Sequence, residues 1–174
     1  MQSIVTGNLG RVVYAQLSPS EDVYKAIVEL AQREKINNGL ILTITGGLEH
    51  VRLSMPGKGE SNDMPPGIFE SEGPAEASGQ GYLGRTESTW ISQTSQIAHH
   101  AGEPFMHVHM GVSIGGVAYV GHLIEGCRVR SLHPKTHFII VLGEITGVDL
   151  SFHNSGQTTE HYPNGLPFYE LAKV

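Results

Sequence analysis

The sequence has a single cysteine, Cys127, and few basic residues. One cysteine cannot form an internal disulfide, and a lone free thiol is typical of proteins from reducing compartments. Lysine and arginine together number 11 against 17 acidic residues, which gives a formal net charge of −6 at pH 7. Without a basic excess, the chain lacks the attraction to phosphates that sustains nucleic-acid binding. These deficits disfavour a disulfide-rich secreted domain, and they disfavour nucleic-acid binding by this chain alone.

Long hydrophobic runs are also missing. No apolar stretch approaches the roughly 20 residues of a membrane-spanning helix, and the start MQSIVTGNLGRVVYA lacks the basic and apolar regions of a signal peptide. Hydrophobic residues make up 39% and charged residues 16%, a balance typical of globular chains. With 174 residues the chain can bury its own core as one domain. We therefore expect a soluble, cytoplasmic, single-domain protein that does not contact membranes.

Glycine, by contrast, is abundant: 22 glycines favour many tight turns and a sheet-rich protein. RVVYAQL (11–17) is typical of a strand, and LILTIT (40–45) of a buried strand. Gly46-Gly47 is expected to bend or bulge this second strand before LEHVRLSM continues it.

The clearest predicted helix lies between these strands. Ser18 can act as its N-cap, Pro19 occupies the first helical position, and Glu21 completes a capping box with Ser18. Asn37-Asn38-Gly39 supplies a stop signal. A strand, a helix and a second strand in this order predict an α/β or α+β domain in which the helix covers a sheet.

Residues 56–85 differ in composition from the rest of the chain. The segment is rich in proline, glycine, serine and glutamate, and it shows no sustained period. We interpret it as a long Pro/Gly-rich insertion within the single domain of residues 1–174. A connection of this length is usually either mobile or functional. One alternative is a disordered surface insertion, and the other is a lid or an arm that embraces a neighbouring subunit.

The second half of the chain predicts further strands. The expected strands are 88–98, 104–112, 117–129 and 136–145, with a turn at 99–104, a hairpin connection through SIGG (113–116) and an irregular tail from 151 onward.

The stretch PFMHVHMGV, residues 104–112, alternates strictly. One parity carries the apolar residues, namely Met106, Val108, Met110 and Val112. The other parity carries His107 and His109. Period-two alternation indicates a half-buried strand whose methionine and valine face packs into a core. The two histidines are either an ordinary solvated face or directed at a common ligand.

The simplest hairpin register brings in a third histidine. If Val112 pairs with Val117, His107 faces His122 directly, and His109 lies one step along the same face. Three imidazoles within reach of one point are suited to a divalent metal, with zinc first and iron, cobalt, nickel or copper as alternatives. The interpretation depends on register, because one bulged residue would turn His122 to the other face.

A site with three nitrogen donors leaves one tetrahedral position of zinc vacant. A water there can act as hydroxide near neutral pH, or a substrate oxygen can be polarised instead. Glu103 and Glu125 are candidate general bases or partners of the imidazole N–H groups, with plain surface carboxylates as the alternative. His99 and His100, in the expected turn, are candidate proton shuttles or residues of a solvated loop.

Two arginines are candidates for substrate binding. Arg128 and Arg130 share the parity of His122, provided that Gly126 does not break the strand. They could hold a substrate carboxylate as bidentate donors, or simply line a solvated strand face. Cys127 stands among apolar residues and is predicted to be a small core residue rather than a nucleophile.

The segments EPFMHVHM and VGHLIEGCRV, followed by VLGEI and GLPFYEL, resemble the plants-and-prokaryotes-conserved (PPC) domain. The family pattern is a P-hydrophobic-H-x-H strand, a short hairpin and G-G-H-L-x-x-G-C-x-V. The opening strand, the capped helix and LILTITGGLEHVRL also match, so the resemblance spans most of the chain outside roughly 56–85. Val120-Gly121 departs from the usual glycine pair, and the segment 56–85 is longer than in typical members.

The resemblance implies an α/β fold with an antiparallel-rich sheet and one major helix, assembled as a homotrimer. It also implies that His107, His109 and His122 form a zinc site like that of prokaryotic members. Plant relatives are DNA-associated, but their AT-hook, with its Arg-Gly-Arg-Pro core, is absent from this sequence.

The leading hypothesis is therefore a metal-dependent enzyme or binding protein for a small molecule, with its pocket partly closed by the insertion or a neighbouring subunit. One alternative is a DNA-associated regulatory protein in which the PPC domain drives oligomerisation. The other is a purely structural metal site.

Overall fold

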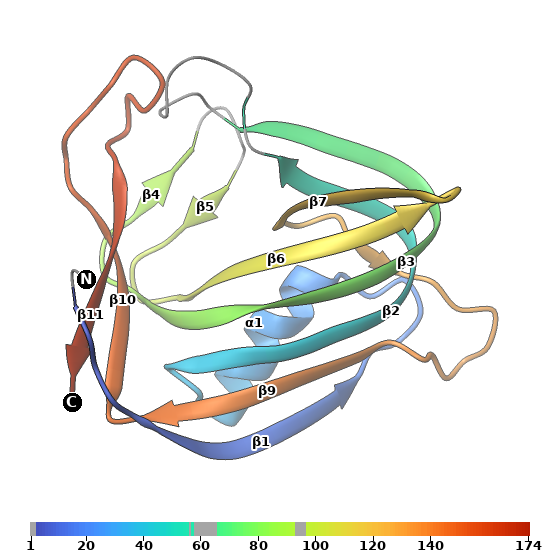
Figure 1. Cartoon of the computed structure of the whole chain (residues 1–174), viewed down its shortest axis with the longest axis horizontal. Coiled ribbons are helices and arrows are strands. Elements are labelled where there is room, and N and C mark those ends of the chain that lie inside the picture. The colour runs from blue at the N-terminus through green and yellow to red at the C-terminus, as the bar shows by residue number, and fades with distance from the viewer. Residues whose placement is uncertain (1–2, 56, 58–65, 93–96) are drawn as a thin grey trace.

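The computed structural model describes residues 3–55, 57, 66–92 and 97–174 (Figure 1). This part of the chain contains one helix and eleven strands, in the order β1 (Asn8–Gln16), α1 (Val23–Glu34), β2 (Gly39–Met55), β3 (Gly67–Thr86), β4 (Trp90–Ile91), β5 (Ala98–His99), β6 (Pro104–Ile114), β7 (Val117–Leu123), β8 (Arg128–Val129), β9 (Ile139–Thr146), β10 (Val148–Asn154) and β11 (Pro167–Lys173). Within these ranges, no helix is both long and apolar enough to cross a membrane.

Nine strands form one sheet in the order β1-β9-β2-β7-β6-β3-β10-β11, with β8 attached to β2. Its neighbouring strands run antiparallel except β3 and β10, which pair in parallel. Strands β4 and β5 form a separate pair. Helix α1 lies behind the central strands in Figure 1. The predicted fold class, an antiparallel-rich mixed sheet with one major covering helix, is confirmed.

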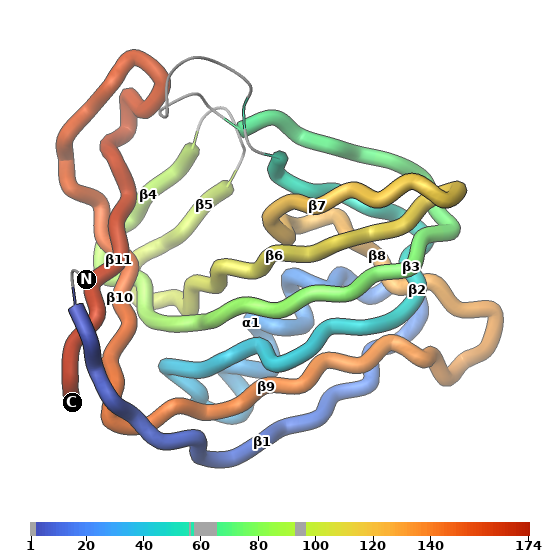
Figure 2. The backbone as a smooth tube through the Cα atoms, viewed as in Figure 1, coloured from blue at the N-terminus to red at the C-terminus, as the bar shows by residue number. Residues whose placement is uncertain are grey.

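The two longest strands, β2 and β3, pair with each other from Gly39 opposite Leu83 to Met55 opposite Gly67. The end of β2 also pairs with β7, β7 pairs with β6, and β6 pairs with β3. These four strands therefore close a ring of backbone hydrogen bonds. Figure 2 shows β2 and β3 curving together at one end of the sheet.

The predicted bend at Gly46-Gly47 is spread over the neighbouring residues. Both glycines stay paired with β3, and the ladder shifts register on either side of them, before Ile44 and after Leu48. Gly46 has a φ of 146°, and a Cβ there would lie 2.7 Å from Cα of Phe138. Only glycine lets the chain entering β9 approach this closely.

Helix α1 begins later than the capping pattern predicted. The N-cap is Asp22, whose carboxylate accepts a hydrogen bond from a backbone N–H of the first turn. Ser18 does donate its backbone N–H to the Glu21 carboxylate, at 2.7 Å, but this contact closes a turn before the helix. Ser20 has a φ of +62°, which is incompatible with a right-handed helix. Ser18 as N-cap and Pro19 as first helical residue were therefore wrong.

The two faces of the sheet differ in exposure. One row of laterally paired residues lies on the buried face, namely Val108, Gly81, Ile41, Leu142 and Val13. The neighbouring row lies on the opposite face, namely His107, Tyr82, Leu40, Gly143 and Val12. Leu40 and Val12 are 40% and 44% exposed. His107 therefore belongs to the outer face, away from the main core.

The predicted insertion at 56–85 was wrong for its larger part, because residues 67–86 form β3, the longest strand. Its abundant glycines permit close approach of the neighbouring strands, since a Cβ at Gly81 would collide with the carbonyl oxygen of His107. The pairing partners on β2 and β6 belong to other segments of the chain, and they override the weak local strand preference of this segment. Residues 56 and 58–65 of the predicted insertion lie outside the described residues.

Two further expectations differ from the structure. The strand predicted at 88–98 is reduced to the short β4 and β5, and residues 93–96 lie outside the described part. The tail predicted as irregular holds much of β10 and all of β11, which pair with each other from Val148 opposite Lys173 to Asn154 opposite Pro167. This late hairpin extends the sheet beyond β3 and brings the last strand close to β6.

Candidate metal centre

A tight hairpin brings the three histidines together. The two glycines of the SIGG turn have φ values of 56° and 85°, so the loop between β6 and β7 holds only these two residues. The predicted pairing of Val112 with Val117 was therefore wrong by two residues. His109, rather than His107, faces His122 directly. A shift of two preserves parity, so the same three side chains remain on one face.

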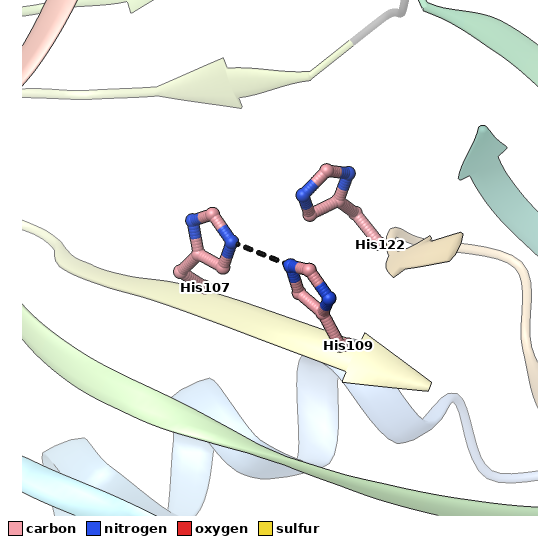
Figure 3. Close-up of side chains that lie close together, drawn as sticks. All are labelled: His107, His109 and His122. Atoms are coloured by element: carbon pink, nitrogen blue, oxygen red, sulfur yellow. Dashed lines mark hydrogen bonds between the residues drawn. The ribbon is translucent and has the colours of Figure 1, made fainter. Parts of the chain in front are cut away.

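The three imidazoles converge on one space. One ligand atom from each of His107, His109 and His122 lies within 4.8 Å of the others. The Nε2 atoms of His107 and His109 are 2.9 Å apart, and the His122 ring centroid lies 4.7 Å from that of His109. Figure 3 shows the two rings from β6 and the ring from β7 around this space. Among the described residues, no further histidine, cysteine, aspartate or glutamate joins the group.

The surroundings keep two of these imidazoles neutral. Burial lowers the pKa of His107 to about 4, with smaller contributions from His122 and His109. Burial also lowers the pKa of His122, helped by His109 and opposed by a hydrogen bond to the backbone of Ser54. At pH 7 both side chains therefore have a free nitrogen lone pair, which is the form that binds metals.

Two further residues surround the histidines. The Tyr169 hydroxyl lies 2.8 Å from Nδ1 of His107, which leaves the other ring nitrogen facing the shared space. Ser54 pairs with His122 across β2 and β7. The Ser54 side chain is fully buried, and its hydroxyl has no hydrogen-bond partner among the described residues.

Sequence reasoning missed both Tyr169 and Ser54. Tyr169 stands in the tail that was predicted to be irregular, 62 positions from His107. The sequence around Ser54 predicts only an ordinary strand residue. No local pattern marks either position, since each reaches the histidines only through long-range strand pairing.

The donor set fits a divalent transition metal. Zinc binds imidazole nitrogens at about 2.0–2.1 Å, so ideal tetrahedral ligands lie about 3.3 Å apart. The nitrogens here, all within 4.8 Å and one pair at 2.9 Å, reach that spacing by small side-chain rotations. Imidazole also suits copper, iron and nickel. A metal-binding histidine usually donates its second N–H to an acceptor, and the Tyr169 oxygen can serve His107 in this way.

His99 differs from its predicted position in a turn. It lies on β5 and is only 8% exposed, with its ring 4.5 Å from that of Phe152. Burial lowers the pKa of His99 to about 4, with smaller contributions from His100 and His107. A cavity of about 310 Å³ is lined by His99 together with His107 and His122. His99 is therefore part of the surroundings of the histidine group.

The remaining acidic and histidine candidates lie farther from the histidine group. His100, Glu103 and Glu125 line a hollow of about 380 Å³ beside α1. This hollow adjoins the histidine cavity, because both are lined by Ile97, His99 and Ile124, but it does not include the three histidines. The Glu125 carboxylate lies 3.2 Å from Nζ of Lys25. The structure thus does not bring these three candidates to the histidine group.

The arginine candidates are also separate, because Gly126 interrupts the strand with a φ of 117°. Arg128 and Arg130 are exposed, and Arg128 pairs with β2 rather than continuing β7. Neither arginine lines the cavity beside the histidines. Cys127 is fully buried in the main core, as predicted, and burial raises the pKa of its thiol to about 12.

The fold and the histidine hairpin agree with a family assignment. The sequence profile of the Plants and Prokaryotes Conserved (PCC) domain, the family also abbreviated PPC, matches residues 4–133. Because this range covers most of the chain, the protein belongs to this family. No curated protein gives a significant match to the sequence.

Several solved structures share the fold. A PPC protein from Pyrococcus horikoshii superposes with a TM-score of 0.66 at 20% identity, covering 99% of this chain and 100% of that one. A metal-containing protein from Archaeoglobus fulgidus gives 0.67 at 16% identity, with coverages of 95% and 98%. A protein from Ralstonia eutropha JMP134, proposed to bind DNA, gives 0.58 at 14% identity, with coverages of 90% and 89%. At these identities the similarity establishes the fold alone.

Proposed function

We propose that this PPC protein holds a divalent transition metal at His107, His109 and His122, and that the metal centre binds or transforms a small molecule. Zinc is the leading candidate. The observation that carries the proposal is the convergence of three imidazoles with no fourth protein ligand among the described residues. Structural zinc sites normally have four protein ligands, whereas sites that act on substrates keep one position open. This difference favours a functional metal over a purely structural one.

The residues around the ion would have distinct tasks. The bound metal would supply a Lewis acid with an open coordination position. Tyr169 would accept a hydrogen bond from Nδ1–H of His107 and so fix the ring with Nε2 toward the ion. The backbone of Ser54 would orient His122 in the same way.

The proposal includes a homotrimer in which a neighbouring subunit covers the outer face of the sheet. This face exposes a group of large apolar side chains, namely Leu9, Val12, Leu40 and Leu42. Leu9 and Leu42 lie side by side over Gly143, because a Cβ at Gly143 would be 2.8 Å and 3.2 Å from their side chains. Contiguous exposed apolar residues are typical of protein interfaces.

The apolar group continues to the histidines. A hollow of about 630 Å³ is lined by Leu40 and Leu42 on one side and by His107 and His109 on the other. A subunit docked on the apolar residues would therefore also shield the exposed His109 edge of the metal centre. In this arrangement, formation of the trimer would also control how a ligand reaches the metal centre.

Metal analysis of the purified protein tests the proposal. We expect about one zinc per chain in the wild type, and loss of zinc in His107→Ala and His122→Ala. His137→Ala is the matched control, because His137 is exposed and stands apart from the group. Unchanged metal content in the first two variants would overturn the proposal. Chelation of the wild type separates the two roles: a retained fold supports an open functional site, whereas unfolding supports a structural metal.

A further inference from the structure

The cavity beside the histidines has a uniform chemistry. Its volume of about 310 Å³ lies at the lower end of the roughly 300–1,000 Å³ typical of small-molecule pockets. Much of its wall is aromatic, formed by Trp90, His99, Phe152, Tyr162 and Tyr169. Aliphatic side chains form most of the rest, with Ser54, His107 and His122 as further polar residues, and no lysine, arginine, aspartate or glutamate lines it within the described part of the chain. The described lining residues of this cavity therefore offer an uncharged surface to the body of a ligand.

The aromatic wall is fixed in place by its own contacts. The Trp90 indole N–H donates a hydrogen bond to the carbonyl of Gly165 at 2.6 Å. Its ring is tilted at 58° to Phe152, with centroids 6.0 Å apart, and stacks with Tyr162 at 6.3 Å. Rings held at different inclinations offer both stacking and edge-to-face contacts to a planar guest. The wall therefore favours an aromatic ring over a flexible aliphatic chain.

The polar groups of the cavity that could bind a ligand lie together at one end. His107 and His122 contribute their rings there, and the neighbouring Ser54 hydroxyl is buried without a hydrogen-bond partner among the described residues. Buried hydroxyls in folded proteins normally have a partner. The side chains that cover this hydroxyl would have to move slightly for a ligand oxygen to reach it and supply the missing acceptor. This end of the cavity therefore favours a ligand whose aromatic ring carries an oxygen acceptor.

We propose that the cavity binds a small aromatic carboxylate, with its ring against Trp90 and Phe152 and its carboxylate between Ser54 and the histidines. The inference rests on the proposed function, because the metal held by the histidines supplies the positive charge that the described lining residues lack. An aromatic amine is disfavoured at this end because the metal repels a cation. A plain hydrocarbon would leave the Ser54 hydroxyl unpaired.

Trp90 provides a built-in probe, since it is the only tryptophan in the sequence. We would titrate the zinc-loaded protein with benzoate, benzylamine and cyclohexanecarboxylate, and follow Trp90 fluorescence together with calorimetry. We expect saturable binding of benzoate, binding at least tenfold weaker for cyclohexanecarboxylate, and no saturable binding of benzylamine. Removal of zinc should weaken benzoate binding at least tenfold.

Two variants test the placement of the ligand. Ser54→Ala should weaken benzoate binding about tenfold, the loss expected for one hydrogen bond to a charged group, and should leave zinc content unchanged. Ser78→Ala, an exposed serine on β3, is the matched control and should bind benzoate like the wild type. Ile124→Phe adds a ring to the cavity wall and should abolish benzoate binding while zinc remains.

The outcomes separate this inference from the proposed metal site. Zinc bound without saturable benzoate binding would overturn the aromatic carboxylate alone, as would equal binding of benzylamine or unchanged affinity in Ser54→Ala. Absence of zinc from the wild type and after zinc addition would overturn both proposals. If Ile124→Phe fails to fold, the Ser54→Ala measurement still decides the placement.

Discussion

The Tyr169 hydroxyl lies 2.8 Å from Nδ1 of His107, and this contact links the last strand of the sheet to the histidine hairpin. In the variant Tyr169→Phe, we expect the ring packing to be retained and the hydrogen-bond acceptor that orients His107 to be lost. We expect zinc affinity to fall roughly 10–100-fold, as is usual when such a supporting hydrogen bond is removed. Competition with a chromophoric chelator measures this change. Tyr14→Phe is the control, because Tyr14 is 74% exposed; equal affinities for the two variants would contradict the prediction.

A second prediction concerns the close approach of β3 and β6. Gly81→Ala should lower the free energy of unfolding by roughly 1–3 kcal/mol, because its methyl group would collide with the backbone at His107. Zinc occupancy should fall as well, since the displaced strand carries two of the histidines. Gly67→Ala, in the same strand, meets nothing within 4 Å and serves as the control. Urea denaturation checks the result, and identical midpoints for both variants would refute it.

A third prediction follows from the burial of His99. Its pKa is about 4 in the folded protein, against about 6.5 in an unfolded chain. Between these values the unfolded chain binds more protons, so the free energy of unfolding decreases as pH falls from 6.5 to 4. Protonation of this residue lowers the free energy of unfolding by at most about 3 kcal/mol, and this full loss is reached below pH 4. Above pH 6.5 the residue causes no such loss.

Denaturation of the metal-free protein at pH 7 and pH 4.5 measures this dependence. His99→Phe should lose less stability between the two pH values than the wild type does. His100→Phe, at the exposed neighbouring position, should behave like the wild type. The same loss in all three proteins would show that His99 titrates normally.

A fourth prediction tests self-association through the outer face. Leu42→Glu places a carboxylate among the exposed apolar residues of β1 and β2, and burying that charge in an interface is costly. Light scattering coupled to size-exclusion chromatography should show three chains per particle for the wild type and one for the variant. Leu132→Glu, at a 93% exposed position, should leave the trimer intact. A wild-type monomer would rule out the proposed assembly.

A fifth prediction addresses nucleic acid. With a net charge of −6, the chain should not shift a DNA duplex in a gel even at about 50 mM salt, where phosphate contacts are strongest. A salt series on the same duplex provides the measurement. Binding that weakens as salt rises would instead support the DNA-associated alternative.

The histidine group was predictable because its geometry is local. Alternation in residues 104–112 placed His107 and His109 on one face, and the glycine turn returned the chain to His122. The register was wrong by two residues, yet the grouping survived because an even shift keeps every side chain on its face. An odd error would have removed His122 from the group.

Features made by distant pairings could not be predicted. Residues 67–86 have a composition typical of loops, and they become a strand only because β2 and β6 supply partners on both sides. His99 was expected in a turn, because no local sequence pattern predicts that its ring packs against Phe152 and Trp90. The aromatic cavity was missed for the same reason.

The distribution of the site along the chain has a consequence for folding. The three histidines come from one short hairpin, whereas Tyr169 reaches them from the last strand. Local contacts form early in folding, and contacts between distant segments form late. A newly made chain can therefore bring the three histidines together before the aromatic wall is complete. In the proposed function, the order of synthesis would favour binding of the metal first and completion of the aromatic cavity afterward.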